Sequence, residues 1–372
     1  MGKTRVIISG GGTGGHIFPA ISIANAIRNL RPDSEILFVG AENRMEMQRV
    51  PEAGYDIEGL PVAGFVRSSI LKNVPVLVKL LRSQMRARRI IRKFSPDVAV
   101  GVGGYASGPT LRMAGRMGIP TLIQEQNSFA GVSNKLLAQR ADRICVAYEG
   151  MEKFFPADKI MMTGNPVRQN LTGNALSRDE AVGAMGLNPE KRVILVIGGS
   201  LGARSLNESI MSQLDAIRAA EDVQIYWQTG KLYIDEMKQR LAAESEPVPN
   251  LFPTDFVTRM DCAYSAADLV ISRAGAGSIS ELCLLGKPVI LVPSPNVAED
   301  HQTKNAMALV DKDAAIHIAD ADAGKSLIPE AIKLVRDKER LGVLGKNALS
   351  LALPDSAEII AKEVLKLADN HN

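Results

Sequence analysis

The amino-acid sequence predicts an α/β protein made of two doubly wound domains, each built on an open parallel sheet. Short apolar runs that end at glycine alternate with amphipathic stretches, which is the pattern of repeated βαβ units. The length of 372 residues predicts two domains, since one domain takes about 100–200 residues. Glycine occurs 32 times and aromatic residues make up 4% of the chain, a composition typical of parallel α/β proteins.

The first predicted domain covers residues 1–163. A strand over residues 5–9, a helix over 17–30 and a strand over 35–40 form its first βαβ unit, because apolar residues recur at helical spacing between two β-branched runs. Three further apolar runs predict buried parallel strands over residues 97–100, 121–123 and 143–146.

The second predicted domain covers residues 164–350. Residues 164–191 are rich in Asn, Pro, Gly and charged side chains, and the strand, glycine loop and helix pattern then restarts at residues 192–200. Further strands are predicted over residues 224–227, 269–271 and 289–292. Residues 351–372 form a C-terminal helix that can pack back on the first domain, with Asp355 and Glu358 at capping-box spacing. Two such sheets in tandem predict a ligand cleft between their carboxyl edges.

Composition excludes several classes of protein. The 46% of hydrophobic residues excludes a disordered chain, and no run of 18 or more apolar residues is present to span a bilayer. Three widely spaced cysteines without a CxxC pattern provide neither a disulfide framework nor a zinc site, which fits a reducing cytoplasm. The first residues lack the apolar run of a signal peptide.

Charge is divided unevenly along the chain. Residues 1–163 contain 22 Lys and Arg against 13 Asp and Glu, and residues 164–372 contain 22 against 28, so we expect the halves to face different partners. Nine Lys and Arg and no acidic residue lie between Arg67 and Lys93, interleaved with aliphatic side chains. Such a segment can dock on anionic lipid or nucleic acid, or it can be the solvent face of a core helix. The scarcity of aromatic residues favours lipid over nucleic acid.

A glycine-rich loop, residues 10–15, follows the first strand and opens the first helix. Its backbone N–H groups and the helix dipole can receive an anion or a developing negative charge. The loop satisfies GxGxxG, but a dinucleotide loop takes a small residue where His16 stands and an acidic residue about 20 positions further on, at the end of the second strand, where the match is poor. An imidazole at a helix N-terminus favours its neutral form, so His16 is a candidate general base, or it only caps the helix.

Other loops at predicted strand ends also have polar or glycine-rich character. Residues 101–109 contain four glycines that permit close approach to the backbone, and residues 124–127 can bind sugar hydroxyls or form a simple turn. Residues 198–204 can cradle phosphates but lack the Gly-Lys-Ser/Thr of a Walker motif, which disfavours ATP hydrolysis. Glu281, one turn into a later helix, can accept both hydroxyls of a ribose or only complement the helix dipole.

Two Asp-x-Asp patterns raise the question of a metal ion. They comprise Asp311 with Asp313 and Asp320 with Asp322, and neither follows a strand at a glycine loop. We therefore expect solvated turns there, with no metal site and no cofactor, and we expect helix N-termini and arginines of the second domain to stabilise a phosphate leaving group.

Several motifs occur together in the order of one enzyme family. They are Gly12-Thr13-Gly14-Gly15-His16, Gly103-Gly104-Tyr105 with Ser107-Gly108-Pro109, Glu125-Gln126-Asn127, Gly164-Asn165-Pro166-Val167-Arg168, Gly198-Gly199-Ser200 with Gly202-Ala203-Arg204, and Ser278 to Glu281. Over essentially its whole length the chain resembles the peptidoglycan N-acetylglucosaminyltransferases that convert lipid I to lipid II. The resemblance implies a GT-B fold, with two Rossmann-like domains facing a central cleft, and an inverting, metal-independent transfer from UDP-N-acetylglucosamine.

The same resemblance implies where the protein acts. It places the chain peripherally on the cytoplasmic face of the bacterial inner membrane, in contact with the undecaprenyl-linked acceptor and an anionic membrane surface. Cell-wall and division proteins are further candidate partners, and nucleic acid is not one.

The resemblance also assigns residues to the reaction. His16 would be the base that deprotonates the C4 hydroxyl of N-acetylmuramic acid. Acceptor binding is assigned to Gly12, Gly103, Gly104, Tyr105 and Ser107. Donor binding is assigned to Thr13, Gly14, Gly15, Asn127, Arg168, Ser200, Val257, Ala276, Gly277, Ser278, Ile279, Ser280, Glu281 and Gln302. Arg168 and the Val257 backbone would meet uracil, Ser200 the diphosphate, and residues 13–15 would also lie around the acceptor pyrophosphate. His301 stays an alternative to Gln302 as the sugar contact.

Two other functions share parts of this pattern. One is a different GT-B transferase with another lipid or aglycone acceptor, from which the loops at residues 12–16 and 103–109 distinguish the chain. The other is a non-catalytic nucleotide-sugar-binding or a dinucleotide-dependent protein. Protection against thermal unfolding by UDP-N-acetylglucosamine or by NAD shows which of the two ligands the chain binds.

Overall fold

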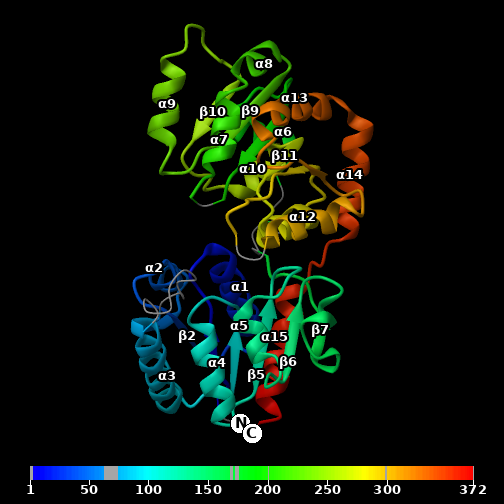
Figure 1. The fold of residues 1–372 in the computed structure, drawn as a ribbon. Helices are drawn as coiled ribbons and strands as arrows, with labels where there is room; N and C mark the ends of the chain where they lie inside the picture. The colour runs from blue at the N-terminus through cyan, green and yellow to red at the C-terminus, as the bar shows by residue number, and fades with distance from the viewer. Residues whose placement is uncertain are drawn as a thin grey trace. The chain divides into compact units, whose positions relative to one another are not determined.

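The computed structural model describes residues 3–62, 74–167, 171, 176–199, 201–297 and 300–371, with the backbone alone at residues 74–78. The chain divides into two compact units, shown in Figure 1. Unit 1 comprises Met1–Arg168 and Leu353–Asn372, and unit 2 comprises Gln169–Ala352.

Unit 1 alternates strands and helices and ends with a helix from the far end of the chain. Its elements are β1 (Arg5–Ser9), α1 (Gly14–Leu30), β2 (Glu35–Ala41), α2 (Glu46–Glu52), β3 (Asp56–Leu60), α3 (Val74–Phe94), β4 (Val98–Gly101), α4 (Ser107–Arg116), β5 (Thr121–Glu125), α5 (Val132–Leu137), β6 (Arg143–Val146), the short 3₁₀ helices η2 (Met151–Lys153) and η3 (Ala157–Lys159), β7 (Ile160–Met162) and α15 (Ser356–Asp369).

The sheet of unit 1 is parallel throughout the part of the chain that the structure describes. Its strand order is β3-β2-β1-β4-β5-β6-β7. The chain adds β2 and β3 on one side of β1 and then returns to add β4 to β7 on the other side, so the strand order switches between β1 and β4. Ligands of open α/β sheets bind outside the carboxyl ends of the strands at such a point. The order therefore places the loops after β1 and β4 side by side at this edge.

The C-terminal helix α15 packs against α1 in unit 1. Ile360, Ala361 and Val364 are buried in one cluster with Ile23 and Ile27 of α1. At the end of the helix the Arg31 guanidinium donates to both carboxylate oxygens of Asp369, at 2.7 and 2.9 Å. Because α1 follows the first glycine loop directly, α15 supports the helix that carries this loop.

Residues 164–167, which the sequence analysis assigned to the second domain, lie with unit 1. The Asn165 carboxamide accepts from Gln124 at 3.0 Å and donates to the Gln126 carbonyl at 3.0 Å, and the Ser22 hydroxyl donates to the Val167 carbonyl. These hydrogen bonds attach the segment to the carboxyl edge of the first sheet, so compositional change alone placed the boundary too early in the chain.

Unit 2 repeats the same alternation. Its elements are α6 (Arg178–Ala184), β8 (Arg192–Ile197), α7 (Arg204–Met211), α8 (Leu214–Ala219), β9 (Val223–Gln228), α9 (Ile234–Ala242), β10 (Leu251–Thr254), α10 (Met260–Ala266), β11 (Leu269–Ser272), α11 (Ala276–Leu284), β12 (Val289–Leu291), α12 (His301–Val310), β13 (Ile316–His317), α13 (Ala323–Arg336) and α14 (Lys338–Ser350).

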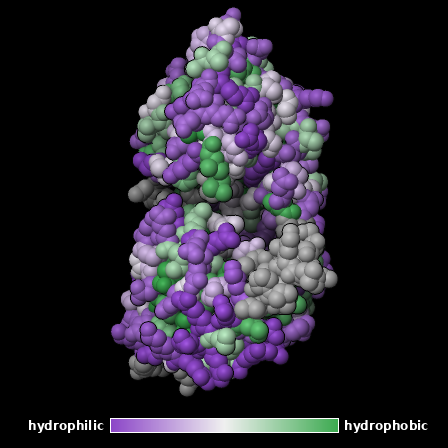
Figure 2. Space-filling model, turned by 60° about the vertical axis from the view of Figure 1, so that its left-hand side comes forward, coloured by the Kyte–Doolittle hydropathy of each residue, from purple (hydrophilic) through white to green (hydrophobic). Residues whose placement is uncertain are grey.

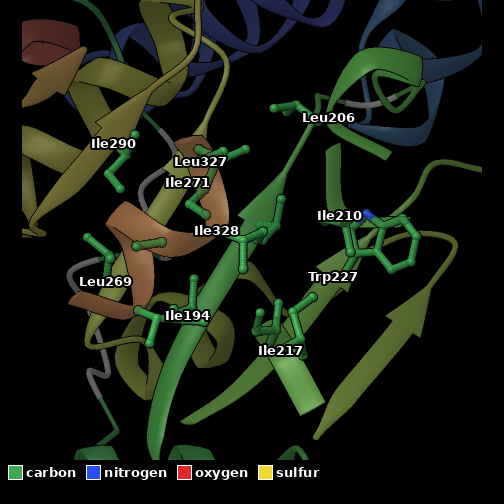
Figure 3. Packing of buried hydrophobic residues seen from close by; sticks show 14 of the residues in the cluster. Ile194, Leu206, Ile210, Ile217, Trp227, Leu269, Ile271, Ile290, Leu327 and Ile328 are labelled. Atoms are coloured by element: carbon green, nitrogen blue, oxygen red, sulfur yellow. The ribbon is translucent and has the colours of Figure 1, made fainter. Parts of the chain in front are cut away.

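The described strands of unit 2 form a second parallel sheet in the order β10-β9-β8-β11-β12-β13. Aliphatic side chains of its strands interlock with those of α7, α8 and α13, as Figure 3 shows around Ile194, Leu206 and Leu327. Trp227 of β9 is fully buried there, and its indole N–H donates to the Asn207 carboxamide at 3.0 Å. Burial without loss of a hydrogen bond makes this tryptophan stabilising.

The structure corrects the predicted capping box of α15 and adds four strands that were not predicted. The N-terminus of α15 has no side-chain cap, so the predicted capping box of Asp355 and Glu358 is wrong, and Glu358 pairs with Lys362 instead. A capping box occurs at Ser177 and Glu180 of α6. The strands β3, β7, β10 and β13 were not predicted, because each is short or lies at or next to an edge of its sheet and lacks a long apolar run.

Hydrophilic side chains predominate on the face of the molecule shown in Figure 2, with hydrophobic side chains in small separate areas. No helix within the described ranges is long and apolar enough to cross a membrane. Cys145, Cys262 and Cys283 are all buried as free thiols.

Candidate active site

The loops after β1 and β4 meet at the carboxyl edge of the first sheet. Two glycines make this possible: Gly103 and Gly104 have φ of +94° and +87°, which side-chain-bearing residues rarely adopt. A Cβ on Gly103 would lie 2.8 Å from His16 Nε2, and a Cβ on Gly104 would lie 2.3 Å from the Gly11 carbonyl oxygen. The structure therefore brings His16 against the second glycine loop, as both were predicted to serve one site.

The His16 ring is oriented by its own loop. Its Nδ1 lies 3.1 Å from the Gly11 carbonyl oxygen and 3.2 Å from the Thr13 hydroxyl. A carbonyl can only accept, so Nδ1 carries the proton when it bonds to Gly11. The lone pair then belongs to Nε2, the nitrogen that faces Gly103. Neutral His16 is thus arranged to accept a proton beside the second glycine loop.

A buried carboxylate that the sequence analysis missed lies beneath the first glycine loop. Glu46, the first residue of α2, is fully buried, and its two oxygens accept from the N–H groups of Gly12 and Ala41, each at 2.9 Å. A Cβ on Gly11 would lie 2.1 Å from this carboxylate. The Gly12 N–H that was expected to be available to a substrate anion is consequently used by the protein.

Of the four polar residues at the end of β5, three are buried and Asn127 is partly exposed. Glu125 is buried, and its oxygens accept from the backbone and side chain of Asn127 and from Gly131 and Asn134. Gln124 and Gln126 are also buried in the network that holds residues 164–167. Among these four side chains, the structure leaves Asn127 as the candidate for a sugar contact.

Tyr105 and Ser107 differ in their access to solvent. Tyr105 is 53% exposed, in keeping with its predicted place in acceptor binding. The Ser107 hydroxyl is buried against Gly101, and no partner for it is found among the described residues. Ser107 is 0% exposed, so the structure offers no surface of this residue to the acceptor contact that the resemblance implied.

In unit 2 the loop after β8 is tied to residue 257 by one side chain. Gln228, the last residue of β9, donates from Nε2 to the Gly199 carbonyl at 2.7 Å and accepts from the Val257 N–H at 3.1 Å. The Val257 N–H is thereby engaged, so its carbonyl is the group left to meet a base. A polar residue at the carboxyl end of a buried parallel strand was the available signal for Gln228.

The start of α11 places its predicted residues in different environments. Ile279 packs into the core, and the Ser280 hydroxyl donates to the Ala276 carbonyl one turn back. Glu281 is 5% exposed and accepts from the Tyr264 hydroxyl at 3.0 Å. Gly277 and Ser278 are more open.

The remaining predicted donor residues are Gln302, Arg168 and Ser200. Gln302, in the first turn of α12, accepts from the Ser294 N–H at 2.8 Å, so its amide NH₂ is the part that could donate to a sugar. Arg168 and Ser200 lie outside the described residues.

Both Asp-x-Asp patterns lie in turns, as predicted, with Asp311, Asp313 and Asp322 exposed, and one carboxylate of each pattern forms an ion pair. Asp313 accepts from both ends of the Arg340 guanidinium, which lowers the pKa of the Asp313 carboxyl. Asp320 pairs with Arg273, which also donates to two carbonyls after β12. The Arg273 guanidinium is therefore engaged by groups within unit 2. Within the described ranges, no group of three His, Cys, Asp or Glu side chains could hold a metal ion.

Residues 6–146 match the glycosyltransferase family 28 N-terminal domain, and residues 193–360 match the glycosyltransferase family 28 C-terminal domain. A Bacteroides fragilis protein, named UDP-N-acetylglucosamine--N-acetylmuramyl-(pentapeptide) pyrophosphoryl-undecaprenol N-acetylglucosamine transferase, is 68% identical over 364 residues, 98% of this chain and 96% of its own. A Bacteroides thetaiotaomicron protein of the same name is 64% identical over 370 residues, 100% of this chain and 99% of its own.

Solved structures agree with these matches. The crystal structure of Acinetobacter baumannii MurG is similar with a TM-score of 0.77 and 26% identity, covering 98% of this chain and all of that one. A UDP-GlcNAc 2-epimerase from Neisseria meningitidis has a TM-score of 0.67 at 14% identity, covering 98% and 100%, which shows the fold alone.

Two parallel-sheet units in tandem, each matched by a glycosyltransferase domain model, identify the chain as a glycosyltransferase of the GT-B class, as the sequence predicted. The chain belongs to glycosyltransferase family 28. The family resemblance carried by the ordered motifs is confirmed.

Proposed function

We propose that this enzyme transfers N-acetylglucosamine from UDP-N-acetylglucosamine to the C4 hydroxyl of N-acetylmuramic acid in undecaprenyl-pyrophosphoryl-MurNAc-pentapeptide. The observation that carries the proposal is the 68% identity, over 98% of this chain, to a relative named for this reaction. The product is the disaccharide-linked lipid that supplies peptidoglycan synthesis.

His16 acts as the general base of this reaction. Nδ1–H bonds to the Gly11 carbonyl, so Nε2 accepts the proton of the acceptor hydroxyl. The oxygen then forms a bond to the anomeric carbon of the donor as the bond from that carbon to the diphosphate breaks, and the sugar configuration inverts. The loop of residues 103–105 beside Nε2 binds the acceptor close to the base.

Unit 2 holds the donor. The Val257 carbonyl accepts from the uracil ring, and the Glu281 carboxylate, held by Tyr264, accepts from the ribose hydroxyls. The glycine loop of residues 198–202, held by Gln228, and the N-terminus of α11 stabilise the charge on the departing diphosphate. Arg168, Ser200, Gln302 and Asn127 complete the donor contacts in this proposal.

The enzyme works at the cytoplasmic face of the inner membrane, docked through a basic face of α3. We define the basic face as four exposed arginines, Arg82, Arg88, Arg89 and Arg92. Leu81 and Met85 beside them are 62% and 66% exposed, while Ala87, Ile90 and Ile91 on the opposite side are buried in the core. Arg86 is not part of this face because it pairs with Glu42 and Glu58. Exposed cations next to exposed apolar side chains favour anionic lipid.

Transfer of labelled N-acetylglucosamine to a lipid I analogue tests the reaction. We expect UDP release and a disaccharide product with the parent chain. In the His16→Ala variant we expect turnover to fall by about 10²- to 10⁴-fold, with the Kd for UDP-N-acetylglucosamine unchanged. Transfer to another acceptor in place of the lipid I analogue would contradict the acceptor assignment, and parental turnover in His16→Ala would remove His16 as the base.

A further inference from the structure

The buried carboxylate of Glu46 and the imidazole of His16 are connected through one peptide group. Glu46 Oε2 accepts from the Gly12 N–H at 2.9 Å, and the Gly11 carbonyl oxygen lies 3.1 Å from His16 Nδ1. The Gly11 carbonyl and the Gly12 N–H are the two ends of the same planar, conjugated amide. A carboxylate at the N–H end polarises this amide and makes its carbonyl a stronger acceptor.

We propose that Glu46 is a positioning residue for the proton acceptor: acting through the Gly11–Gly12 peptide, its carboxylate holds His16 with the proton on Nδ1 and stabilises the imidazolium that forms when Nε2 takes the acceptor proton. This proposal rests on the proposed function, because it supposes that His16 is the base. Glu46 itself gains and loses no proton. The proton moves from the acceptor hydroxyl to Nε2, and the hydroxyl electron pair goes to the anomeric carbon.

The local sequence is built to admit this carboxylate. A Cβ on Gly11 would lie 2.1 Å from Glu46 Oε1, and a Cβ on Gly40 would lie 2.6 Å from Glu46 Cγ. Any side chain at these two positions would collide with the carboxylate or its stem. The second oxygen is held by the Ala41 N–H at 2.9 Å, so the carboxylate cannot rotate away from the peptide without losing a hydrogen bond.

The carboxylate offsets an unfavourable feature of the site. His16 lies in the first turn of α1, where the positive end of the helix dipole disfavours an imidazolium, and this turn contains no acidic residue. The loop after β4 carries Tyr105 as its titratable side chain. The carboxylates of Glu42, directly after β2, and Glu58, within β3, pair with Arg86. Among the described residues, Glu46 is joined to backbone N–H groups and to no cationic side chain, so its charge is not cancelled by a cation.

The Glu46→Gln variant tests the proposal through the pH profile of kcat/KM. Loss of a unit charge at about 8 Å from the ring should shift the acid limb to lower pH by about 0.5–1 unit and should lower the plateau about 10- to 100-fold. The acid limb moves down because the imidazolium is less stabilised, so His16 becomes a weaker base. A merely structural role for Glu46 would lower the plateau without moving the limb.

Two comparisons distinguish failure of the positioning role of Glu46 from failure of the proposed function. Glu52→Gln, at an exposed position of the same helix paired with Arg49, is the matched control and should retain the parental profile. In the His16→Ala background, Glu46→Gln should have no further effect on turnover, because Glu46 acts through the ring. Parental turnover in His16→Ala would contradict the assignment of His16 as the base. A large loss of turnover in His16→Ala together with an unmoved acid limb in Glu46→Gln would overturn only the positioning role of Glu46.

A measurement on the unaltered protein keeps the proposal testable if Glu46→Gln does not fold. The chain has four histidines, so nitrogen-15 resonances of the rings can be assigned by replacing each in turn. We expect the neutral His16 ring to be protonated at Nδ1. A neutral ring protonated at Nε2 would overturn the proposal, because Nε2 could not then accept the acceptor proton.

Discussion

The Gly103→Ala substitution should disable catalysis by displacing His16. A Cβ at residue 103 would lie 2.7 Å from His16 Cδ2 and 2.8 Å from Nε2, far inside the 3.4 to 4 Å of ordinary contact. The φ of +94° adds about 1–2 kcal/mol of backbone strain for any side-chain-bearing residue. The ring or the loop must move by about 1 Å to relieve the overlap, and a displacement of that size costs about 10²-fold in rate.

Two other glycines separate the contributions of strain and overlap. Gly118 has a φ of +79° but no atom within 4 Å of its Cβ position, so Gly118→Ala should lose about 1–2 kcal/mol of stability and retain kcat. Gly342 is exposed within α14, again with no atom within 4 Å of its Cβ position, so Gly342→Ala should be more stable by about 0.5–1 kcal/mol.

The assay measures kcat for sugar transfer and the midpoint of urea unfolding for each of the three variants. We expect Gly103→Ala to lose stability by at least as much as Gly118→Ala and, unlike it, to lose turnover by about 100-fold. Equal turnover in these two variants would refute the packing of residue 103 against the His16 ring.

Three further outcomes are expected. Tyr264→Phe removes the hydroxyl that holds Glu281, so calorimetry should show UDP-N-acetylglucosamine binding weakened by about 5- to 20-fold, while the pH profile of turnover is unchanged. Unaltered affinity would contradict the contact between Glu281 and the ribose. Replacing the four arginines of the basic face with glutamine should weaken co-sedimentation with anionic vesicles and flatten its salt dependence, while a soluble acceptor is still converted; equal vesicle binding would leave α3 as a solvated core helix. Burial raises the pKa of the Cys145 and Cys283 thiols to about 12, so they should react with a disulfide reagent at pH 8 only after unfolding. Since the unfolded thiols ionise near 9.0, the free energy of unfolding should also fall as pH rises from there toward 12, and rapid labelling of the folded protein would contradict this burial.

The sequence alone predicted nine of the thirteen strands that the structure describes, and the bounds of the helices α1 and α15 approximately. Apolar periodicity and the glycine that follows a strand are local features, and residues within a few positions of one another determine them. His16 at the start of α1 and Glu281 in the first turns of α11 were recognised in the same way. The ordered motifs also predicted the family.

Tertiary structure decided which residues contact one another at the two sheet edges. Glu46 lies 34 positions from Gly12, and Gln228 lies 29 positions from both Gly199 and Val257. Neither side chain has a local pattern that names its partner. The predicted capping box shows that a local pattern can also name the wrong partner. Asp355 and Glu358 have the right spacing, but Glu358 pairs with Lys362.

The physical reason lies in the pairing of strands that are not consecutive. β1 pairs with β4 in parallel, and this register alone brings the loop of residues 10–13 against that of residues 102–105. A hydrogen bond depends on a separation of about 3 Å in space, whatever the separation along the chain. Local periodicity therefore determined that His16 would stand at the tip of a helix, and the register of β1 against β4 decided that its Nε2 would face Gly103.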